Sequence, residues 1–237
     1  MAREQLNGAY NWHEFPARPD LAAVLSERVA NRLAAAIAAR GTAFLAVSGG
    51  TTPARFFAAL STAAIAWDKV VVTLIDERFV PASSPRSNAG LVAANLLRNA
   101  AAAARFVPLY HEATSIEDAA ASDDAALRQL PWPLDVAVLG MGADGHTASF
   151  FPDADDLTVL LDPASSRIVL PVHAASAGEP RLTLAMARIV DAGFLALHIE
   201  GDDKRAAFNG AMGPGPKKPI RAVFDASPRA VEVFWAP

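Results

Sequence analysis

Hydrophobic residues follow two kinds of pattern along this chain, one with helical spacing and one made of short unbroken runs. The helical pattern is clearest after Asp20, where apolar side chains recur every four residues at Leu21, Leu25, Val29, Leu33 and Ile37. This spacing puts an apolar stripe on one helix face, with Asp20 as the cap and Gly41 as the end. Similar signals predict helices over residues 21–40, 53–60, 87–98, 115–130, 181–190 and 202–209, with Thr52 capping the second.

The unbroken apolar runs are short and several are rich in β-branched residues, which indicates buried strands. They predict strands over residues 43–47, 70–75, 134–139, 167–172, 194–199, 220–224 and 231–235. Strands and helices therefore alternate, and the strands lack the polar–apolar alternation of a half-exposed sheet. This order predicts an α/β protein with a mostly parallel sheet in a three-layer α/β/α fold. Residues 212–219 fit a local loop better than a linker, so we expect a single domain over residues 1–237.

Composition and charge narrow the class of protein. Hydrophobic residues make up 52% of the chain and charged residues 19%, which argues against disorder. The net charge is −4 and no basic face is apparent, so we expect no nucleic-acid partner. Cysteine is absent, which excludes disulfides, thiolate metal ligands and a cysteine nucleophile.

Membrane and export signals are also missing from the sequence. The mean hydropathy of +0.22 comes from alanine, and no apolar stretch approaches the roughly 18 residues that a membrane-spanning helix needs. Residues 1–19 carry several charges and lack the apolar core of a secretory signal. We therefore expect no membrane partner and a cytoplasmic location.

Candidate chemistry gathers just after the predicted strands, because open parallel sheets bind ligands at the carboxyl ends of their strands. Strand 43–47 is followed by Ser48-Gly49-Gly50-Thr51 and then by a helix. Backbone N–H groups and the helix dipole favour an anion at such a turn, although an ordinary tight turn is the alternative. The Walker-A and G-x-G-x-x-G sequences are both absent, so a small phosphorylated metabolite fits better than a nucleotide.

Charged residues follow two further strands. Asp76-Glu77-Arg78 comes directly after strand 70–75. This segment has two interpretations. It is a strand end exposed to solvent, or one of its carboxylates acts on the substrate while Arg78 binds anionic oxygens. Lys204 lies in the first turn of a predicted helix, against the preference of the helix dipole, which an anionic ligand would explain. A solvated lysine is the alternative there, and Arg181 supplies further positive charge.

The loop after strand 134–139 has the densest chemistry. Between Gly140 and His146 it holds three glycines, Asp144 and His146 itself. Glycine lets the backbone bend tightly and approach a ligand, and histidine titrates near neutral pH, as a general base requires. The aspartate and the histidine are also metal-ligand types, but no second histidine pair accompanies them, so we expect no metal.

The motifs together resemble those of one enzyme family. They are Ser48-Gly49-Gly50-Thr51-x-Pro53, Asp76-Glu77-Arg78-x-Val80 with Ser87-Asn88, Gly140-x-Gly142-x-Asp144-Gly145-His146-Thr147-Ala148-Ser149-x-x-Pro152, Arg181-x-Thr183 and Gly201-x-x-Lys204. In this order the chain resembles the 6-phosphogluconolactonases of the glucosamine-6-phosphate isomerase/6-phosphogluconolactonase family. The resemblance implies a modified Rossmann-type fold and hydrolysis of 6-phospho-D-glucono-1,5-lactone to 6-phosphogluconate in the oxidative pentose phosphate pathway. It also implies a cytosolic, cofactor-free enzyme whose partner is a small phosphosugar lactone, and we expect a monomer or weak homodimer.

The same resemblance implies roles for individual residues. His146 would be the general base that activates water, and Asp144 and Asp76 would hold the polar network around it. Arg78 would face the sugar or lactone end. The 6-phosphate would be bound by Gly49, Gly50, Thr51, Arg181 and Lys204, with Ser48 beside them.

Two other functions have to be weighed. A glucosamine-6-phosphate deaminase or isomerase shares most of these motifs, but such enzymes usually have an Asn-Glu-Pro segment after the histidine, and a tyrosine or similar residue where this chain has Arg78. Here Thr147-Ala148-Ser149-Phe150-Phe151-Pro152 follows, with no carboxylate before Asp153. A non-catalytic sugar-phosphate sensor would need a DNA-binding region, and about twenty residues before the first predicted helix are too few for one. Both comparisons favour the lactonase.

Overall fold

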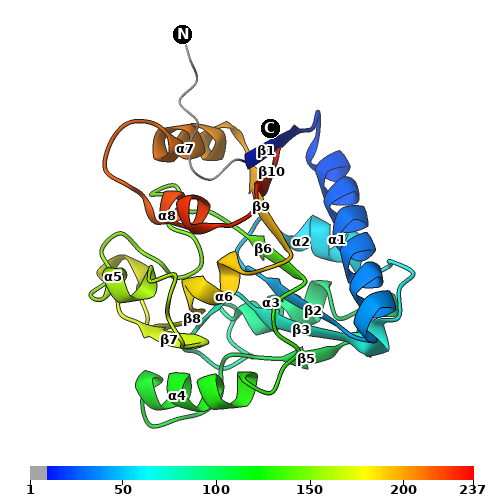
Figure 1. Cartoon of the computed structure of the whole chain (residues 1–237), viewed down its shortest axis with the longest axis horizontal. Helices are drawn as coiled ribbons and strands as arrows, with labels where there is room; N and C mark the ends of the chain where they lie inside the picture. The colour runs from blue at the N-terminus through cyan, green and yellow to red at the C-terminus, as the bar shows by residue number, and fades with distance from the viewer. Residues whose placement is uncertain (1–9) are drawn as a thin grey trace.

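A seven-stranded, fully parallel sheet crosses the middle of the molecule, and helices cover both of its faces (Figure 1). The computed structural model describes residues 10–237. In spatial order the strands are β1 (Tyr10–Glu14), β10 (Val231–Ala236), β9 (Phe194–Glu200), β6 (Val136–Leu139), β2 (Ala43–Val47), β3 (Val70–Leu74) and β5 (Arg105–Val107). The predicted α/β fold with a mostly parallel sheet is confirmed.

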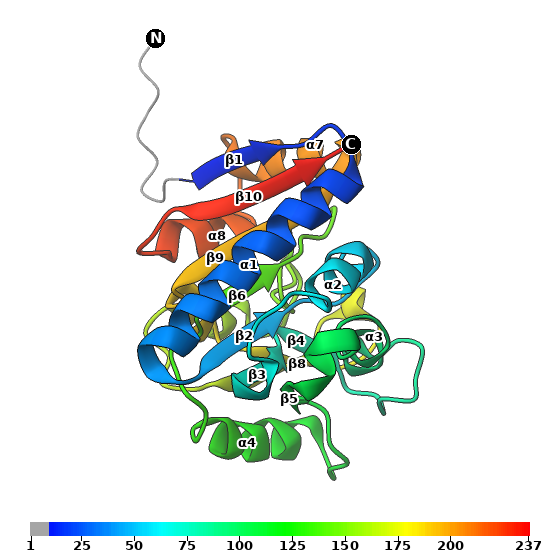
Figure 2. The same cartoon turned by 90° about the vertical axis from the view of Figure 1, so that its right-hand side faces the viewer.

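The helices form an outer layer on each side of this sheet. The helices α1 (Arg18–Arg40) and α2 (Ala54–Leu60) lie on one side, and α6 (Met186–Val190), α7 (Asp202–Met212) and α8 (Pro219–Ala226) on the other (Figures 1 and 2). Helix α3 (Asn88–Asn95) packs beside α2. Strands β2, β3 and β6 are buried at every position, as expected for strands covered on both faces.

A second, three-stranded antiparallel sheet extends the molecule on one side. It has the order β4 (Asp76–Arg78), β8 (Arg181–Leu184) and β7 (Val169–Val172). Helix α4 (Ile116–Leu127) packs against it, and the short helix α5 (Leu157–Leu160) precedes it in the chain. Short 3₁₀ turns cover Trp67–Lys69, Asn99–Ala103 and Ala175–Ala177.

The structure corrects two of the predicted elements. The first half of the predicted helix 181–190 is strand β8, because its backbone pairs with β4 on one side and β7 on the other. The predicted strand 220–224 is helix α8, in which Pro219 stands at the start and Ile220, Val223 and Phe224 form one buried face. A short apolar run does not by itself separate a strand from a turn of helix.

Strands β1, β4 and β5 were not predicted, and two predicted caps are wrong. β4 is Asp-Glu-Arg, a sequence without a strand signal. Asp20 lies inside the first turn of α1, whose cap is Ala17, and Pro53 rather than Thr52 caps α2. Gly41 does end α1, with a φ of 78° that glycine adopts without strain.

The predictions about the chain's N-terminal end and domain organisation are left untested. Residues 1–9, part of the segment in which we expect no secretory signal, lie outside the described residues. The single domain over residues 1–237 likewise stays a prediction. Within residues 10–237, no helix has the length and apolarity needed to cross a membrane.

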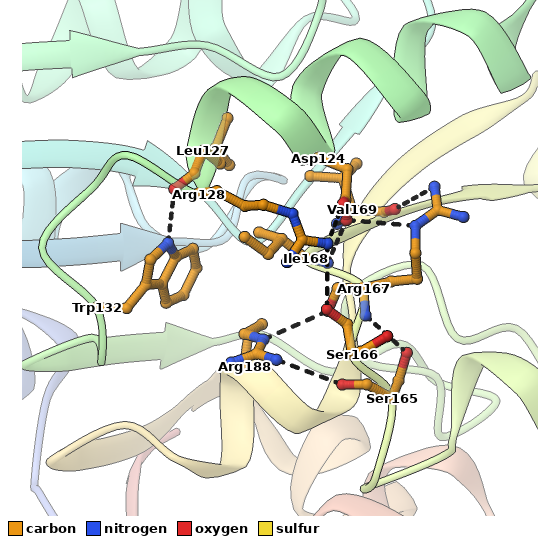
Figure 3. Close-up of polar contacts among 10 residues, drawn as sticks. All are labelled: Asp124, Leu127, Arg128, Trp132, Ser165, Ser166, Arg167, Ile168, Val169 and Arg188. Carbon is orange, nitrogen blue, oxygen red and sulfur yellow. Dashed lines mark hydrogen bonds and ion pairs between the residues drawn. The ribbon is translucent and has the colours of Figure 1, made fainter.

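Asp124 connects α4 to the small sheet through a buried network (Figure 3). Its Oδ1 accepts hydrogen bonds from the backbone N–H groups of Ile168, at 2.5 Å, and Val169, at 3.2 Å. Arg128 donates to Oδ2 at 2.6 Å, and Arg167 lies 3.3 Å from Oδ1. Burial alone would raise the pKa of Asp124, but these donors outweigh it and hold the pKa below its usual range.

We predict that Asp124→Ala lowers the free energy of unfolding by about 2–4 kcal/mol at neutral pH, because it leaves buried donors without an acceptor. Since the folded-state pKa is lowered, this stabilisation is present above the unfolded carboxyl pKa and is lost as pH falls through the folded one. Denaturant unfolding at neutral and acidic pH measures both effects. Asp118→Ala, on the exposed face of α4, is the matched control. An equal difference between wild type and Asp124→Ala at both pH values would contradict the prediction.

Candidate active site

A cleft of about 240 Å³ opens at the carboxyl ends of β2, β6 and β9, beside β4 and β8. Nine of the ten predicted site residues line it: Ser48, Gly49, Gly50, Thr51, Asp76, Arg78, His146, Arg181 and Lys204. The tenth, Asp144, contacts His146 from within the same loop. The fold therefore brings together residues from five separate motifs, as expected at the carboxyl edge of a parallel sheet.

His146 and Asp144 form a hydrogen-bonded pair at the mouth of the cleft. Asp144 Oδ1 lies 2.6 Å from His146 Nδ1 and also accepts the His146 backbone N–H at 3.1 Å. The ring packs against Phe151, with 4.5 Å between the centroids. Because Nδ1 is engaged by Asp144, Nε2 is the ring nitrogen left to exchange a proton with a ligand. This is the geometry of an oriented general base.

The loop around this pair is folded tightly by its own backbone. Gly142 N–H donates to the His146 carbonyl at 2.8 Å, and Thr147 Oγ1 donates to the Gly140 carbonyl at 2.7 Å. A Cβ on Gly142 would lie 2.2 Å from the His146 ring and 2.5 Å from Asp144 Oδ1. Glycine at this position therefore leaves the space that the pair occupies.

Asp76 is the second acidic group of the cleft. It is 7% exposed, and its Oδ2 accepts a hydrogen bond from Ser149 Oγ at 2.7 Å. Its backbone carbonyl accepts from Asn88 Nδ2 at 2.8 Å. Asp76 thus links β4 to the loop that carries His146.

Glu77 lies on the other side of β4 and has a different environment. It is fully buried, and its two oxygens accept hydrogen bonds from Ser87 Oγ and from the backbone N–H groups of Arg78, Asn88 and Ala89, at 2.7 to 3.0 Å. Burial raises the pKa of Glu77, and these donors oppose the rise without cancelling it. Of the two carboxylates that follow strand 70–75 in the sequence, the cleft contains Asp76, the one that the resemblance implies, while Glu77 joins β4 to the start of α3.

The turn after β2 borders the cleft, and its two positions Gly49 and Gly50 accept only glycine without strain or overlap. A Cβ on Gly49 would overlap the Asn88 side chain at 1.8 Å, and Gly50 has a φ of 91°, which favours glycine. The Ser48 hydroxyl is buried and has no hydrogen-bond partner among the described residues. Both glycines are thus required by close approach or by backbone conformation.

Three cationic side chains line the cleft. Arg181 is 9% exposed, donates to the Ala177 carbonyl at 2.9 Å and lies over the Phe151 ring. Burial lowers the pKa of Arg181, and the nearby Asp76 carboxylate partly offsets this. Lys204 Nζ donates to the Met141 carbonyl at 2.9 Å.

Arg78 donates through Nη1 to the Arg86 carbonyl, and its buried Nε has no partner among the described residues. The register pairs Arg78 with Arg181 across β4 and β8. Two guanidinium groups are therefore placed on adjacent strands at a cleft wall, an arrangement suited to an anionic ligand.

Among the residues of the cleft wall that were not proposed as site residues from the sequence, Asn88 and His198 carry polar side chains. Asn88 follows the Ser87 cap of α3, and His198 lies within the apolar run of β9. The only signal for His198 was a polar residue near the end of a strand otherwise filled with apolar ones. Within residues 10–237, no three His, Cys, Asp or Glu side chains are grouped as a metal site would require, and the expectation of no metal or cofactor stays a prediction.

The fold and the cleft define a class of protein: an α/β enzyme with a histidine–aspartate pair and a cation-lined cleft for a small anionic ligand. The chain belongs to the family described as glucosamine-6-phosphate isomerases/6-phosphogluconolactonase, whose family model matches residues 16–235.

Individual relatives agree with this assignment. The chain is 81% identical to the 6-phosphogluconolactonase of Mesorhizobium japonicum over the full length of both, and 52% identical to that of Rhizobium meliloti over 96% of this chain and 99% of the relative. The crystal structure of a 6-phosphogluconolactonase from Shewanella baltica superposes with a TM-score of 0.93 at 35% identity, covering 96% of this chain and 98% of that one.

We predict that Gly142→Ala displaces the His146 ring and lowers activity about a hundredfold while the protein remains folded. The added Cβ meets two side chains at the cleft mouth, which can rotate away, so stability falls little. Steady-state kinetics, the melting temperature and ¹⁵N NMR of the imidazole nitrogens measure these effects. Gly210→Ala, whose Cβ would meet nothing within 4 Å, is the matched control. Wild-type activity in Gly142→Ala would show that the position of His146 is not critical.

Proposed function

We propose that this chain hydrolyses 6-phospho-D-glucono-1,5-lactone to 6-phosphogluconate, the second step of the oxidative pentose phosphate pathway. The observation that carries the proposal is the hydrogen-bonded pair of His146 and Asp144 at a cleft lined by Arg78, Arg181 and Lys204. The cationic side chains fit a phosphorylated substrate, and the pair fits general-base attack by water on its lactone carbonyl. The names of the relatives support the same reaction.

The reaction begins with His146 as the base. Nε2 takes a proton from a water molecule while the water oxygen attacks C1 of the lactone. Asp144 accepts the hydrogen bond of Nδ1–H, fixes the ring's tautomer and stabilises the imidazolium that forms. The attack produces a tetrahedral intermediate with its negative charge on the former carbonyl oxygen. Arg78 or the backbone N–H groups of the glycine loop supply the donors for this oxyanion.

Collapse of the intermediate opens the ring. The bond between C1 and the ring oxygen breaks, and the proton held by His146 passes to the departing ring oxygen, which becomes the hydroxyl on C5. The carboxylic acid formed at C1 then ionises, so one water is consumed and the base is regenerated. Asp76, fixed by Ser149, holds the polar network next to this position.

We assign binding of the 6-phosphate to the glycine turn after β2 and to two cationic side chains of the cleft. Gly49, Gly50 and Thr51 offer backbone N–H groups, Ser48 and Thr51 offer hydroxyls, and Arg181 and Lys204 supply positive charge. Remote binding of this kind holds the lactone carbonyl near His146.

A glucosamine-6-phosphate deaminase or isomerase is the second candidate, because the family includes isomerases. Such an enzyme needs another carboxylate for its acid–base steps after the histidine. The first one after His146 is Asp153, whose oxygens accept from the Ser176 hydroxyl at 2.6 Å and its backbone N–H at 2.9 Å. Because Asp153 does not line the cleft, the lactonase reaction fits better. Purified protein that releases ammonia from glucosamine 6-phosphate and leaves the lactone unchanged would reverse this choice.

The remaining features of the proposal follow from the composition of the chain and from the family resemblance. They are a cytoplasmic location, no cofactor, no nucleic-acid or membrane partner, and a monomer or weak homodimer. Each stays a prediction.

We predict that His146→Ala lowers kcat for lactone hydrolysis about 10²–10⁴-fold, the usual contribution of a general base. The side chain is 30% exposed, so the melting temperature changes little. Lactone hydrolysis corrected for the spontaneous rate, together with thermal unfolding, measures both effects. His173→Ala, which removes an exposed histidine on another surface, is the control. Nearly intact turnover in His146→Ala would remove the general-base role.

We predict that Arg181→Ala and Lys204→Ala each raise KM for the phosphorylated lactone at least about tenfold, since each removes a charged hydrogen-bond donor. Unphosphorylated gluconolactone lacks the group that these residues bind, so its kcat/KM changes much less. Parallel kinetics on the two lactones provide the comparison. Equal losses on both substrates would contradict the assignment of the phosphate to Arg181 and Lys204.

A further inference from the structure

His198 is a buried histidine that reaches the cleft from the interior of the sheet. It is 3% exposed, yet its side chain forms part of the cleft wall. The sheet register pairs Val47 with Val138 and Leu139 with Leu197. Continuing this register by one residue beyond Leu197 and two beyond Val47 places His198 level with Gly140 and with Gly49, the first glycine of the turn after β2.

His198 contacts α2, the helix that follows that turn. Its ring meets Phe56 of α2 edge-on, with 6.1 Å between the centroids. Phe57 of the same helix also lines the cleft. Because the glycine turn leads directly into α2, His198 lies on the side of the cleft that we assign to the 6-phosphate.

Only one ring nitrogen of His198 is paired. Nε2 lies 3.2 Å from Glu200 Oε1, and no described residue hydrogen-bonds Nδ1. Because His198 belongs to the cleft wall, a ring nitrogen without a partner among the described residues is available to a ligand there.

The carboxylate that holds the His198 ring, Glu200, is itself surrounded by positive charge. Glu200, with a side chain 6% exposed, lies 3.4 Å from Arg18 Nε, and Arg55 also acts on it electrostatically. Burial alone would raise the pKa of Glu200, but the hydrogen bond with His198 and the positive charges of His198, Arg18 and Arg55 outweigh it. The carboxylate is therefore ionised, and it accepts a hydrogen bond from Nε2–H of the ring. Arg181 and Lys204 are the charged residues of the cleft that we assign to the same phosphate.

We propose that His198 is a further substrate-binding residue, which donates a hydrogen bond from protonated Nδ1 to the 6-phosphate while Glu200 fixes the ring through Nε2. The proposal rests on the lactonase function proposed above. At about pH 7 a phosphate monoester is mostly a dianion. Donation from Nδ1 to the phosphate and from Nε2 to Glu200 needs a proton on both ring nitrogens, so phosphate binding to a neutral ring takes up one proton.

Two isosteric substitutions separate binding from structure. In His198→Gln, the amide nitrogen replaces Nε2 and keeps the contact with Glu200, but the donor at the Nδ1 position is lost. In His198→Asn, the amide nitrogen replaces Nδ1 and keeps a neutral donor toward the cleft, but the contact with Glu200 is lost. His173→Gln, at a histidine paired with Glu117 away from this cleft, is the matched control.

Binding is measured by titration calorimetry of 6-phosphogluconate at about pH 7, in buffers of different ionisation enthalpy. We expect the wild type and His173→Gln to take up a proton on binding. His198→Gln should lose this uptake and bind about 10–100-fold more weakly, since a hydrogen bond to a charged group is lost. His198→Asn should bind with intermediate affinity and without proton uptake.

Kinetics complete the test. We expect His198→Gln to raise KM for the phosphorylated lactone with kcat within about twofold, and to leave unphosphorylated gluconolactone unaffected. Wild-type affinity and proton uptake in His198→Gln, or equal losses on both lactones, would overturn the proposal. A wild-type protein that binds 6-phosphogluconate with proton uptake but does not hydrolyse the lactone would refute the proposed function and leave the role of His198 standing.

Discussion

The carboxylate of Glu77 is fully buried and accepts hydrogen bonds from four donors, three of them backbone N–H groups. A carboxylate at this depth requires such donors, and meeting that requirement fixes β4 against the start of α3. Because successive side chains of a strand point to opposite faces, Asp76 and Arg78 then face the cleft together. The charged groups of the cleft wall are therefore held in position by Glu77, a residue that does not itself line the cleft.

The antiparallel sheet adds a constraint that a purely parallel fold would lack. The chain leaves β3 at Ile75, whose backbone still bonds to Val47 of the main sheet and Leu184 of the small one. Pairing of β4 with β8 then sets Arg78 opposite Arg181, although 103 residues separate them in sequence. The parallel sheet brings the glycine turn and His146 to the same edge, and the small sheet supplies the guanidinium groups. The two architectures together complete the cleft.

Much of this arrangement was predictable because local signals and tertiary environment agree. Strand β2 matches its predicted range, and α7 begins where expected, since an unbroken apolar run and a helix start are each local features. The prediction failed where partners decide the conformation. Arg181–Leu184 is a strand because two neighbouring strands hydrogen-bond to it, and β4 exists only through β8. His198 was overlooked because its exposure to the cleft follows from register, which one strand's sequence does not contain.

The sequence by itself determined the alternation of strands and helices, the chemistry available after each strand and the motifs that define the family. These depend on residue types at short spacing, where sterics and hydrogen bonding act locally. Only the tertiary structure decided how Glu77 is buried beside the cleft, which histidine joins His146 there and which strand carries Arg181. Those outcomes depend on long-range pairing and on the cost of burying charge without partners, and both are properties of the assembled fold.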